Sequence, residues 1–113
     1  MSTHTSTESA FLTQATEALD ALETALTHIG QAADIDWDLH RADNVLTIEL
    51  PDGGKLIINS QAAMRQLWVA ASSGGYHFSR DADGLWRNTR NGQELRATLS
   101  ALLSAQCGQT VSL

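Results

Sequence analysis

The stretch Val45-Leu46-Thr47-Ile48-Glu49-Leu50-Pro51-Asp52-Gly53-Gly54-Lys55-Leu56-Ile57-Ile58-Asn59 decides the fold of this 113-residue chain. Over residues 45–50, bulky apolar side chains alternate with other residues, as in a β-strand that buries one face. Residues 51–54 have turn chemistry, and the apolar run over residues 55–59 fits a returning strand. The stretch therefore predicts a β-hairpin within an antiparallel sheet.

Further strands are predicted on both sides of this hairpin. Asp34-Ile35-Asp36-Trp37-Asp38-Leu39 alternates carboxylates with bulky apolar residues, so its apolar side chains should pack inward and its aspartates project outward. Residues 66–71, 75–79 and 85–89 are short strand-forming runs separated by turn residues. Short strands with tight connections predict a meandering antiparallel sheet of five or six strands.

An amphipathic helix is predicted before the sheet. Apolar residues recur at spacings of three and four from Leu12 to Ile29, and Gly30 is the predicted stop. The acidic residues Glu17, Asp20 and Glu23 lie on its other side at i, i+3 spacing, which makes them neighbours on the helix surface.

A second helix is predicted after the sheet. Its apolar stripe runs from Leu95 to Leu103, with a predicted cap at Asn91 and a stop at Gly108. Two amphipathic helices and one sheet can bury their apolar sides together only as two layers. The predicted fold class is therefore α+β, a two-layer α/β sandwich with both helices on one face of the sheet.

The composition fits one globular domain covering residues 1–113. Apolar residues make up 42% of the chain and charged residues 18%, which is unlike a disordered chain. The sequence has neither an 18-residue apolar run nor a charged segment leading into a short apolar one, so no transmembrane helix or secretory signal is predicted. A cytoplasmic location is expected. The single cysteine, Cys107, excludes an internal disulfide and a multi-cysteine metal site.

Negative charge is concentrated in the first forty residues. The net charge is −6; residues 1–40 hold seven acids and no Lys or Arg, whereas residues 41–113 hold six acids and seven bases. Nucleic acid and anionic membranes would be repelled by the acidic region, so neither is expected as its partner. Cations or a basic protein surface remain as the expected partners of the acidic region.

Two predicted elements contribute to this acidic surface. If the first helix lies beside residues 34–39, their carboxylates meet along one edge of the molecule: Glu17, Asp20, Glu23, Asp34, Asp36 and Asp38. Carboxylate oxygens are hard donors that suit Mg²⁺, Ca²⁺, Mn²⁺ and iron, so weak and exposed cation sites are expected. The alternative is a merely solvated surface, because exposed charges cost little to keep and deter pairing between sheet edges.

No catalytic arrangement is visible in the sequence. The four histidines are scattered, and neither HExxH, GxSxG nor a glycine-rich loop between strand and helix occurs. The chain is therefore expected not to be an enzyme. Trp68, between the inward Leu67 and Val69, is predicted on the solvent face of the sheet. It is either a hot spot for protein binding or lies flat on its neighbours.

Several stretches of the chain match one known family. They are Leu46-Thr47-Ile48, residues 52–59, Gln61, Gln66-Leu67-Trp68-Val69-Ala70, residues 73–78, and Trp86 with residues 89–95. Together they resemble the frataxin family, in its bacterial form called CyaY, nearly end to end. The resemblance implies a frataxin-like α-β5/6-α fold. It also implies a role in iron–sulfur cluster assembly through iron binding and contact with the cysteine desulfurase and the scaffold protein.

The resemblance further implies roles for particular residues. The iron-binding acidic ridge of the family is matched by Glu23, Asp34, Asp36 and Asp38, to which helix spacing adds Glu17 and Asp20. The partner-docking sheet surface is matched by Asn59, Gln61, Gln66 and Trp68. The expected ligand is weakly bound Fe²⁺ or Fe³⁺, with no organic cofactor, no nucleic acid or membrane partner, and a monomeric state without metal.

The chain also departs from the family pattern. Bacterial relatives are usually rich in acids between the positions of Glu23 and Asp34, whereas residues 24–33 contain none, so a reduced iron capacity is expected. His28 offers either an extra ligand or an ordinary surface histidine. The alternative function is a metal-independent adaptor that docks its acidic edge on a basic patch of the desulfurase. Iron oxidation is least favoured because no dinuclear ligand set is visible.

Overall fold

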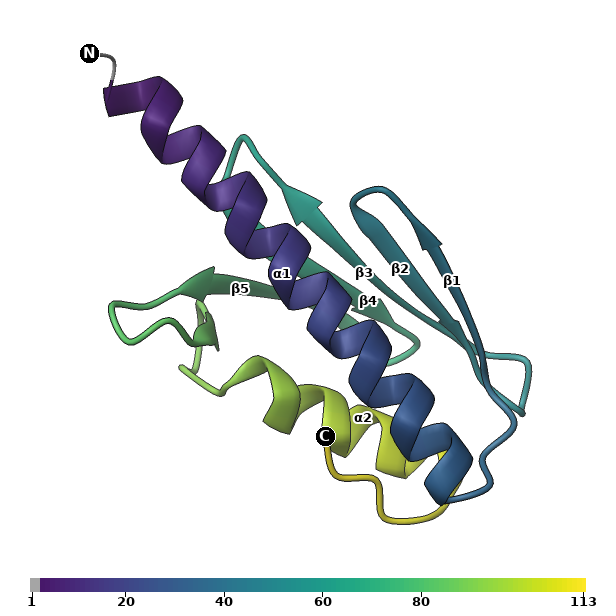
Figure 1. Cartoon of the computed structure of the whole chain (residues 1–113). Helices are drawn as coiled ribbons and strands as arrows, with labels where there is room; N and C mark the ends of the chain where they lie inside the picture. Colours follow the sequence, from purple (N-terminus) through teal and green to yellow (C-terminus); the bar gives the residue numbers. More distant parts are fainter. Residues whose placement is uncertain (1–2) are drawn as a thin grey trace.

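In the computed structural model, which describes residues 3–113, a long and a short helix lie against one face of a six-stranded sheet (Figure 1). The elements are α1 (Thr3–Ala32), β1 (Asp38–Ala42), β2 (Val45–Glu49), β3 (Lys55–Gln61), β4 (Gln66–Ala71), β5 (Gly74–Arg80), β6 (Trp86–Asn88) and α2 (Leu95–Cys107). All strand pairs are antiparallel, and their order in the sheet follows the chain. The predicted two-layer α+β fold is confirmed.

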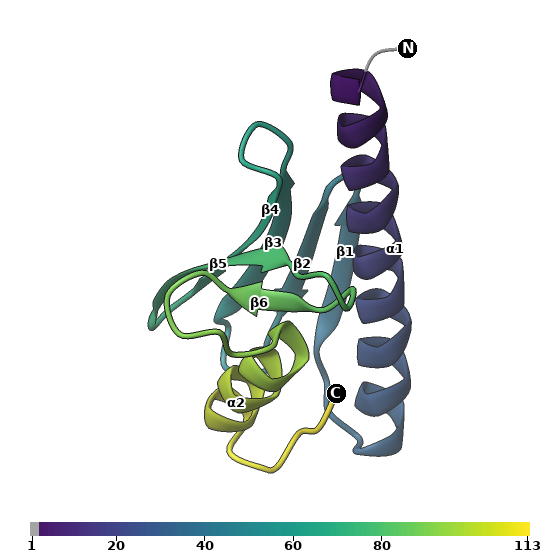
Figure 2. The ribbon, with the colours of Figure 1, turned by 90° about the vertical axis from the view of Figure 1, so that its left-hand side faces the viewer.

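The helices and the sheet share one core. Figure 2 shows α1 running along one side of the strands and α2 lying beside β6. Alternate strand residues enter this core, as the residue pattern predicts, and leave the residues of the opposite face half-buried or exposed. The fully buried strand side chains include Leu46, Ile48, Leu56, Ile58, Leu67, Val69 and Phe78. Burial of each large apolar side chain contributes about 1.5–3 kcal/mol, so this interface dominates the stability. Neither helix described here is long and apolar enough to cross a membrane.

The buried stripe of α1 begins one residue earlier than predicted. Leu12 is 46% exposed, whereas Phe11 is buried. Phe11 lies four residues before Ala15 and eight before Leu19, so the helical repeat turns it toward the core with them. Its ring packs edge-on against Trp86, with centroids 6.1 Å apart and planes at 75°.

Gly30 is predicted to stop α1, but the structure places it inside the helix, which continues to Ala32. A Cβ atom at this position would lie 2.5 Å from the Trp37 indole nitrogen, so the missing side chain gives the indole room to pack on the helix. The same nitrogen donates a hydrogen bond of 3.2 Å to the carbonyl of Leu26. Trp37 is buried as predicted, at 8% exposure.

Residues 34–37 are not part of a strand, contrary to the prediction. Asp34 adopts the left-handed backbone conformation with φ 53°, and the Ile35 N–H donates to the Gly30 carbonyl at 2.8 Å. The chain is therefore still reversing out of α1 and cannot yet pair with β2. The predicted alternation survives in the side chains: Trp37 is buried, Ile35 and Leu39 are half-buried, and the three aspartates are exposed.

The start of α2 also differs from the prediction, whereas its end agrees. The N-cap is Glu94, whose carboxylate accepts from the Arg96 and Ala97 N–H groups at 3.0 and 3.2 Å. Asn91 instead accepts from the Gln93 N–H in the preceding turn, because residues 91–93 are still non-helical. Gly108 ends the helix at φ 69°, a left-handed conformation that favours glycine.

Candidate functional site

The six predicted ridge carboxylates divide into separate groups. Asp34, Asp36 and Asp38 are exposed and line one shallow depression beside the last turns of α1. Asp20 and Glu23 lie farther back along α1 and contact an arginine of β1. Glu17 lines a different depression, with Arg80, Glu94 and Arg96 among its neighbours. The structure therefore does not bring all six carboxylates together at one site.

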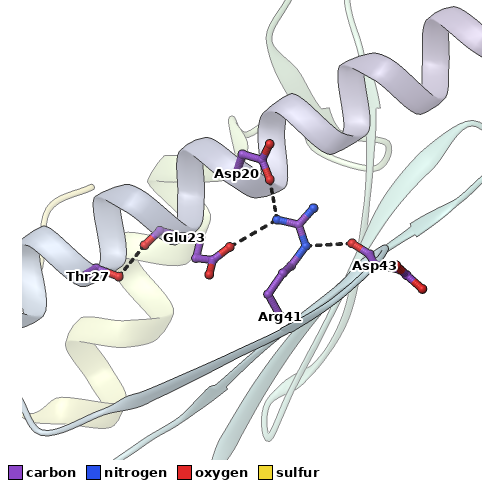
Figure 3. Close-up of polar contacts among 5 residues, drawn as sticks. All are labelled: Asp20, Glu23, Thr27, Arg41 and Asp43. Atoms are coloured by element: carbon purple, nitrogen blue, oxygen red, sulfur yellow. Dashed lines mark hydrogen bonds and ion pairs between the residues drawn. The ribbon is translucent and has the colours of Figure 1, made fainter.

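Arg41 of β1 forms ion pairs with Asp20 and Glu23 of α1 (Figure 3). Its Nη1 donates to Asp20 Oδ1 at 2.7 Å and to Glu23 Oε1 at 3.3 Å. Its Nε donates to the Asp43 carbonyl oxygen at 2.8 Å, in the turn between β1 and β2. The Arg41 side chain is only 16% exposed, so most of it is shielded from solvent.

Strand register explains why Arg41 reaches the helix. Arg41 lies opposite the fully buried Leu46, so it projects from the sheet face that α1 covers. Asp38 lies opposite Glu49 instead and projects from the other face. Sequence reasoning missed this contact because the charge count divided the chain after residue 40, which separated Arg41 from the acidic residues before it. The alternation that continues from Leu39 to Arg41 is the signal that could have found it.

The carboxylates are not preassembled into a tight metal site. Among residues 3–113, no three His, Cys, Asp or Glu side chains are grouped so that they could hold a metal ion. Within that part of the chain, no Lys or Arg forms an ion pair with Asp34, Asp36 or Asp38. Their hard, exposed and uncompensated oxygens fit loosely held, hydrated cations. His28 is exposed and lines a depression with Asp20 and Glu23.

The four predicted docking residues do share one surface, the sheet face opposite the helices. Asn59 pairs with Trp68 across β3 and β4, and Gln61 pairs with Gln66. The Trp68 indole N–H donates to Gln66 Oε1 at 2.8 Å. All four side chains are half-buried, so their polar groups and the indole edge remain within reach of a partner.

His77 joins this surface, although sequence reasoning missed it. It lies opposite Trp68 in the β4–β5 register, and the two rings stack with centroids 4.3 Å apart and planes at 8°. Trp68 thus lies flat on a neighbour, which is one of the two alternatives left by the sequence, and it remains part of the open face. The hairpin register of β4 and β5 is the signal that could have found His77.

Shifted pKa values occur away from both surfaces. Hydrogen bonds from the Leu85 N–H and the Arg87 guanidinium lower the pKa of Asp81. Burial, followed by the negative charge of Asp52, raises the pKa of the Cys107 thiol. Cys107 is half-buried against the core.

The chain forms a six-stranded antiparallel meander that one helix precedes and another follows, with carboxylates at one edge and a tryptophan on the open face. This arrangement defines a frataxin-like protein. The family model described as "Frataxin-like domain" matches residues 4–109. The chain therefore belongs to the frataxin family, and within it to the bacterial CyaY type.

Individual relatives support this assignment. "Iron-sulfur cluster assembly protein CyaY" of Cupriavidus metallidurans is 49% identical over 106 residues, covering 94% of this chain and 95% of the relative. The protein of the same name from Janthinobacterium sp. is 49% identical over 108 residues, covering 95% and 96%.

Solved frataxin structures share the fold. Frataxin from Psychromonas ingrahamii aligns with a TM-score of 0.77 at 30% identity, covering 93% of this chain and 95% of that one. Trimeric yeast frataxin complexed with ferrous iron aligns with a TM-score of 0.73 at 30% identity, covering 85% and 87%.

Proposed function

We propose that the protein is an accessory, regulatory component of iron–sulfur cluster assembly. In this role it binds iron weakly at its acidic edge and contacts the cysteine desulfurase–scaffold complex. The observation that carries the proposal is end-to-end similarity to bacterial relatives named for this process, in a chain that presents two separate polar surfaces. The whole chain, residues 1–113, would act as one cytoplasmic, non-enzymatic domain, monomeric without metal.

Iron is the cargo of this proposal, and the segment after α1 is its main contact. Asp34, Asp36 and Asp38 supply exposed hard oxygens, and no arginine within residues 3–113 forms an ion pair with them. Because these oxygens are not preassembled, a bound Fe²⁺ or Fe³⁺ keeps much of its hydration and is released easily. The ferrous complex of the yeast relative supports iron as the cation. Glu17, Asp20 and Glu23 are secondary contributors in this proposal.

The open sheet face is the proposed docking surface for the desulfurase–scaffold complex. Trp68 is a large aromatic side chain whose orientation is fixed by His77 and Gln66. An aromatic anchor bordered by amides such as Asn59 and Gln61 has the character of a binding hot spot with a polar rim. No organic cofactor, nucleic acid or membrane is part of this proposal.

A second candidate function is a metal-independent adaptor. It is favoured by the scattered carboxylates and by the neutralisation of Asp20 and Glu23 through Arg41. In this function the acidic edge docks electrostatically on a basic patch of the desulfurase, and iron is incidental.

Cluster assembly coupled to the desulfurase, measured at varied iron concentration, tests both candidates. The variants are Asp34→Asn with Asp36→Asn, Trp68→Ala, and Asp83→Asn as a control in an exposed turn of the same sheet. Iron-dependent function predicts that the double variant shifts the iron dependence, that Trp68→Ala weakens complex formation at every iron concentration, and that the control changes neither. The adaptor predicts equal weakening by the double variant with and without iron. Wild-type behaviour of both test variants would refute the proposal.

A further inference from the structure

The positively charged side chain of Arg41 lies beside Asp20 and Glu23, the carboxylates that α1 contributes to the acidic edge. One Arg41 nitrogen lies within hydrogen-bonding distance of oxygens from both Asp20 and Glu23, at 2.7 and 3.3 Å. The two carboxylates are three residues apart on α1, so they are surface neighbours that would otherwise repel each other. Arg41 therefore does for these two side chains what a bound cation would do.

The arginine is better fixed than an ordinary surface partner. Its side chain is 16% exposed, while those of Asp20 and Glu23 are 64% and 39% exposed. A third hydrogen bond, from Nε to the Asp43 carbonyl at 2.8 Å, ties the guanidinium to the β1–β2 turn. Strand register aims Arg41 at α1 in any case, because it lies opposite the buried Leu46. The guanidinium therefore cannot leave the carboxylates simply by swinging into solvent.

An incoming divalent cation would face an unequal choice along this edge. At Asp20 and Glu23 it meets the positive charge of Arg41 beside both carboxylates, and binding through Asp20 Oδ1 or Glu23 Oε1 would break a charge-assisted hydrogen bond. At Asp34, Asp36 and Asp38 it meets exposed carboxylates that no Lys or Arg of the described chain contacts. Cation binding is thus favoured at the second group and disfavoured at the first.

We infer that Arg41 is an internal counter-ion that blocks cations from Asp20 and Glu23 and confines their binding to the segment 34–38. This inference deepens the proposed function and rests on cation binding at the acidic edge. Arg41 thereby limits how many cations the acidic edge can bind. Replacing Arg41 by a neutral side chain would open a second site on α1.

The test is a Ca²⁺ titration of isotope-labelled protein, followed through the side-chain carboxylate ¹³C signals. Ca²⁺ is a diamagnetic, oxygen-seeking probe, so each carboxylate reports its own binding. The variants are Arg41→Gln, Arg41→Lys and Arg87→Gln. Arg87 is a matched control because it also donates to a carboxylate at 2.7 Å, that of Asp81, but in the β5–β6 turn.

In wild type, the signals of Asp34, Asp36 and Asp38 should respond to Ca²⁺ at concentrations that leave Asp20 and Glu23 unchanged. Arg41→Gln should lower the concentration needed at Asp20 and Glu23 by about tenfold, because one positive charge beside a divalent ion changes its binding by roughly that factor in water. For Arg41→Lys, the Ca²⁺ concentration needed at Asp20 and Glu23 should lie between those of wild type and Arg41→Gln. Arg87→Gln should match wild type.

Two results would overturn the inference. One is an equal response of Asp20 and Asp34 in wild type, and the other is an Arg41→Gln titration identical to that of Arg87→Gln. Amide spectra of each variant verify the fold, and Arg41→Lys keeps the test informative if the neutral variant does not fold. Absence of any response at Asp34, Asp36 and Asp38 would instead count against the proposed function, so the two failures are distinguishable.

Discussion

The indole of Trp68 lies flat on the imidazole of His77, with ring centroids 4.3 Å apart and ring planes at 8°. The two residues are direct neighbours across β4 and β5 on the face that the helices leave open. A large aromatic side chain is thereby held in one orientation before any partner arrives. Preorganisation of this kind reduces the entropic cost of binding.

Removal of the stacking partner should therefore affect stability and docking together. His77→Ala is expected to lower the free energy of unfolding by about 0.5–1.5 kcal/mol, the range for aromatic pairs. His77→Phe keeps a flat ring and should stay close to wild type. Urea denaturation and binding to the desulfurase measure the two effects. Equal behaviour of the alanine and phenylalanine variants would show that stacking is unimportant.

Gly30→Ala should destabilise the protein although alanine favours helices. The new Cβ would lie 2.5 Å from Trp37 Nε1, so the indole must move and overpacking should cost about 1–3 kcal/mol, partly offset by about 1 kcal/mol of helix propensity. Gly75→Ala is the control, because a Cβ there meets only the Val69 carbonyl at 3.9 Å. Urea midpoints compare the two variants. An unchanged midpoint for Gly30→Ala would contradict the packing role assigned to this glycine.

The backbone of Asp34 separates charge effects from conformational ones. Its φ of 53° favours glycine, asparagine or aspartate. Asp34→Ala and Asp34→Gly remove the same charge, yet the alanine variant should be less stable by about 1 kcal/mol because of left-handed strain. Thermal unfolding of both variants measures this difference. Equal stability would mean that the turn relaxes, and alanine would then serve as well as asparagine in tests of the acidic edge.

Asp81 should make part of the stability depend on pH in the acid range. Hydrogen bonds from the Leu85 N–H and the Arg87 side chain lower its pKa in the folded state. A lowered carboxyl pKa contributes stability that is fully present above the unfolded value, about 3.9 for aspartate, and is lost as the pH falls through the folded value. The stability difference between wild type and Asp81→Asn should therefore be constant near neutral pH and shrink below about pH 3.9. Unfolding curves from pH 7 to pH 3 provide the measurement, and a difference that grows in acid would exclude this linkage.

The layers and the strand order follow from local patterns, and so they could be predicted. The turn at Pro51–Gly54 and the alternation on either side define β2 and β3 without reference to the rest of the chain. The segment after α1 was harder. In residues 34–39, alternation gives the correct exposures but the wrong element, because Asp34 reverses the chain through a left-handed residue. Periodicity reports which side chains are buried and is silent about backbone pairing.

The candidate site shows the same division. The residues proposed for docking share a face because strand alternation fixes their side, and this could be read from the sequence. The contacts of Arg41 with Asp20 and of His77 with Trp68 join residues from different elements, so they depend on register and on the placement of α1. Gly30 illustrates the remaining difficulty, since a glycine needed for close approach to Trp37 looks like a helix stop when only its own neighbourhood is considered.

The sheet order β1-β2-β3-β4-β5-β6 has a consequence for how the chain acquires its structure. Each strand finds its partner immediately before or after itself, so the loops closed during assembly are short and lose little entropy. Hairpins of this kind form in about 1–10 μs, before slower long-range docking. We therefore expect the strands to pair first with their neighbours in the chain, starting from the turns. The amphipathic helices at the two ends of the chain should pack on the sheet last.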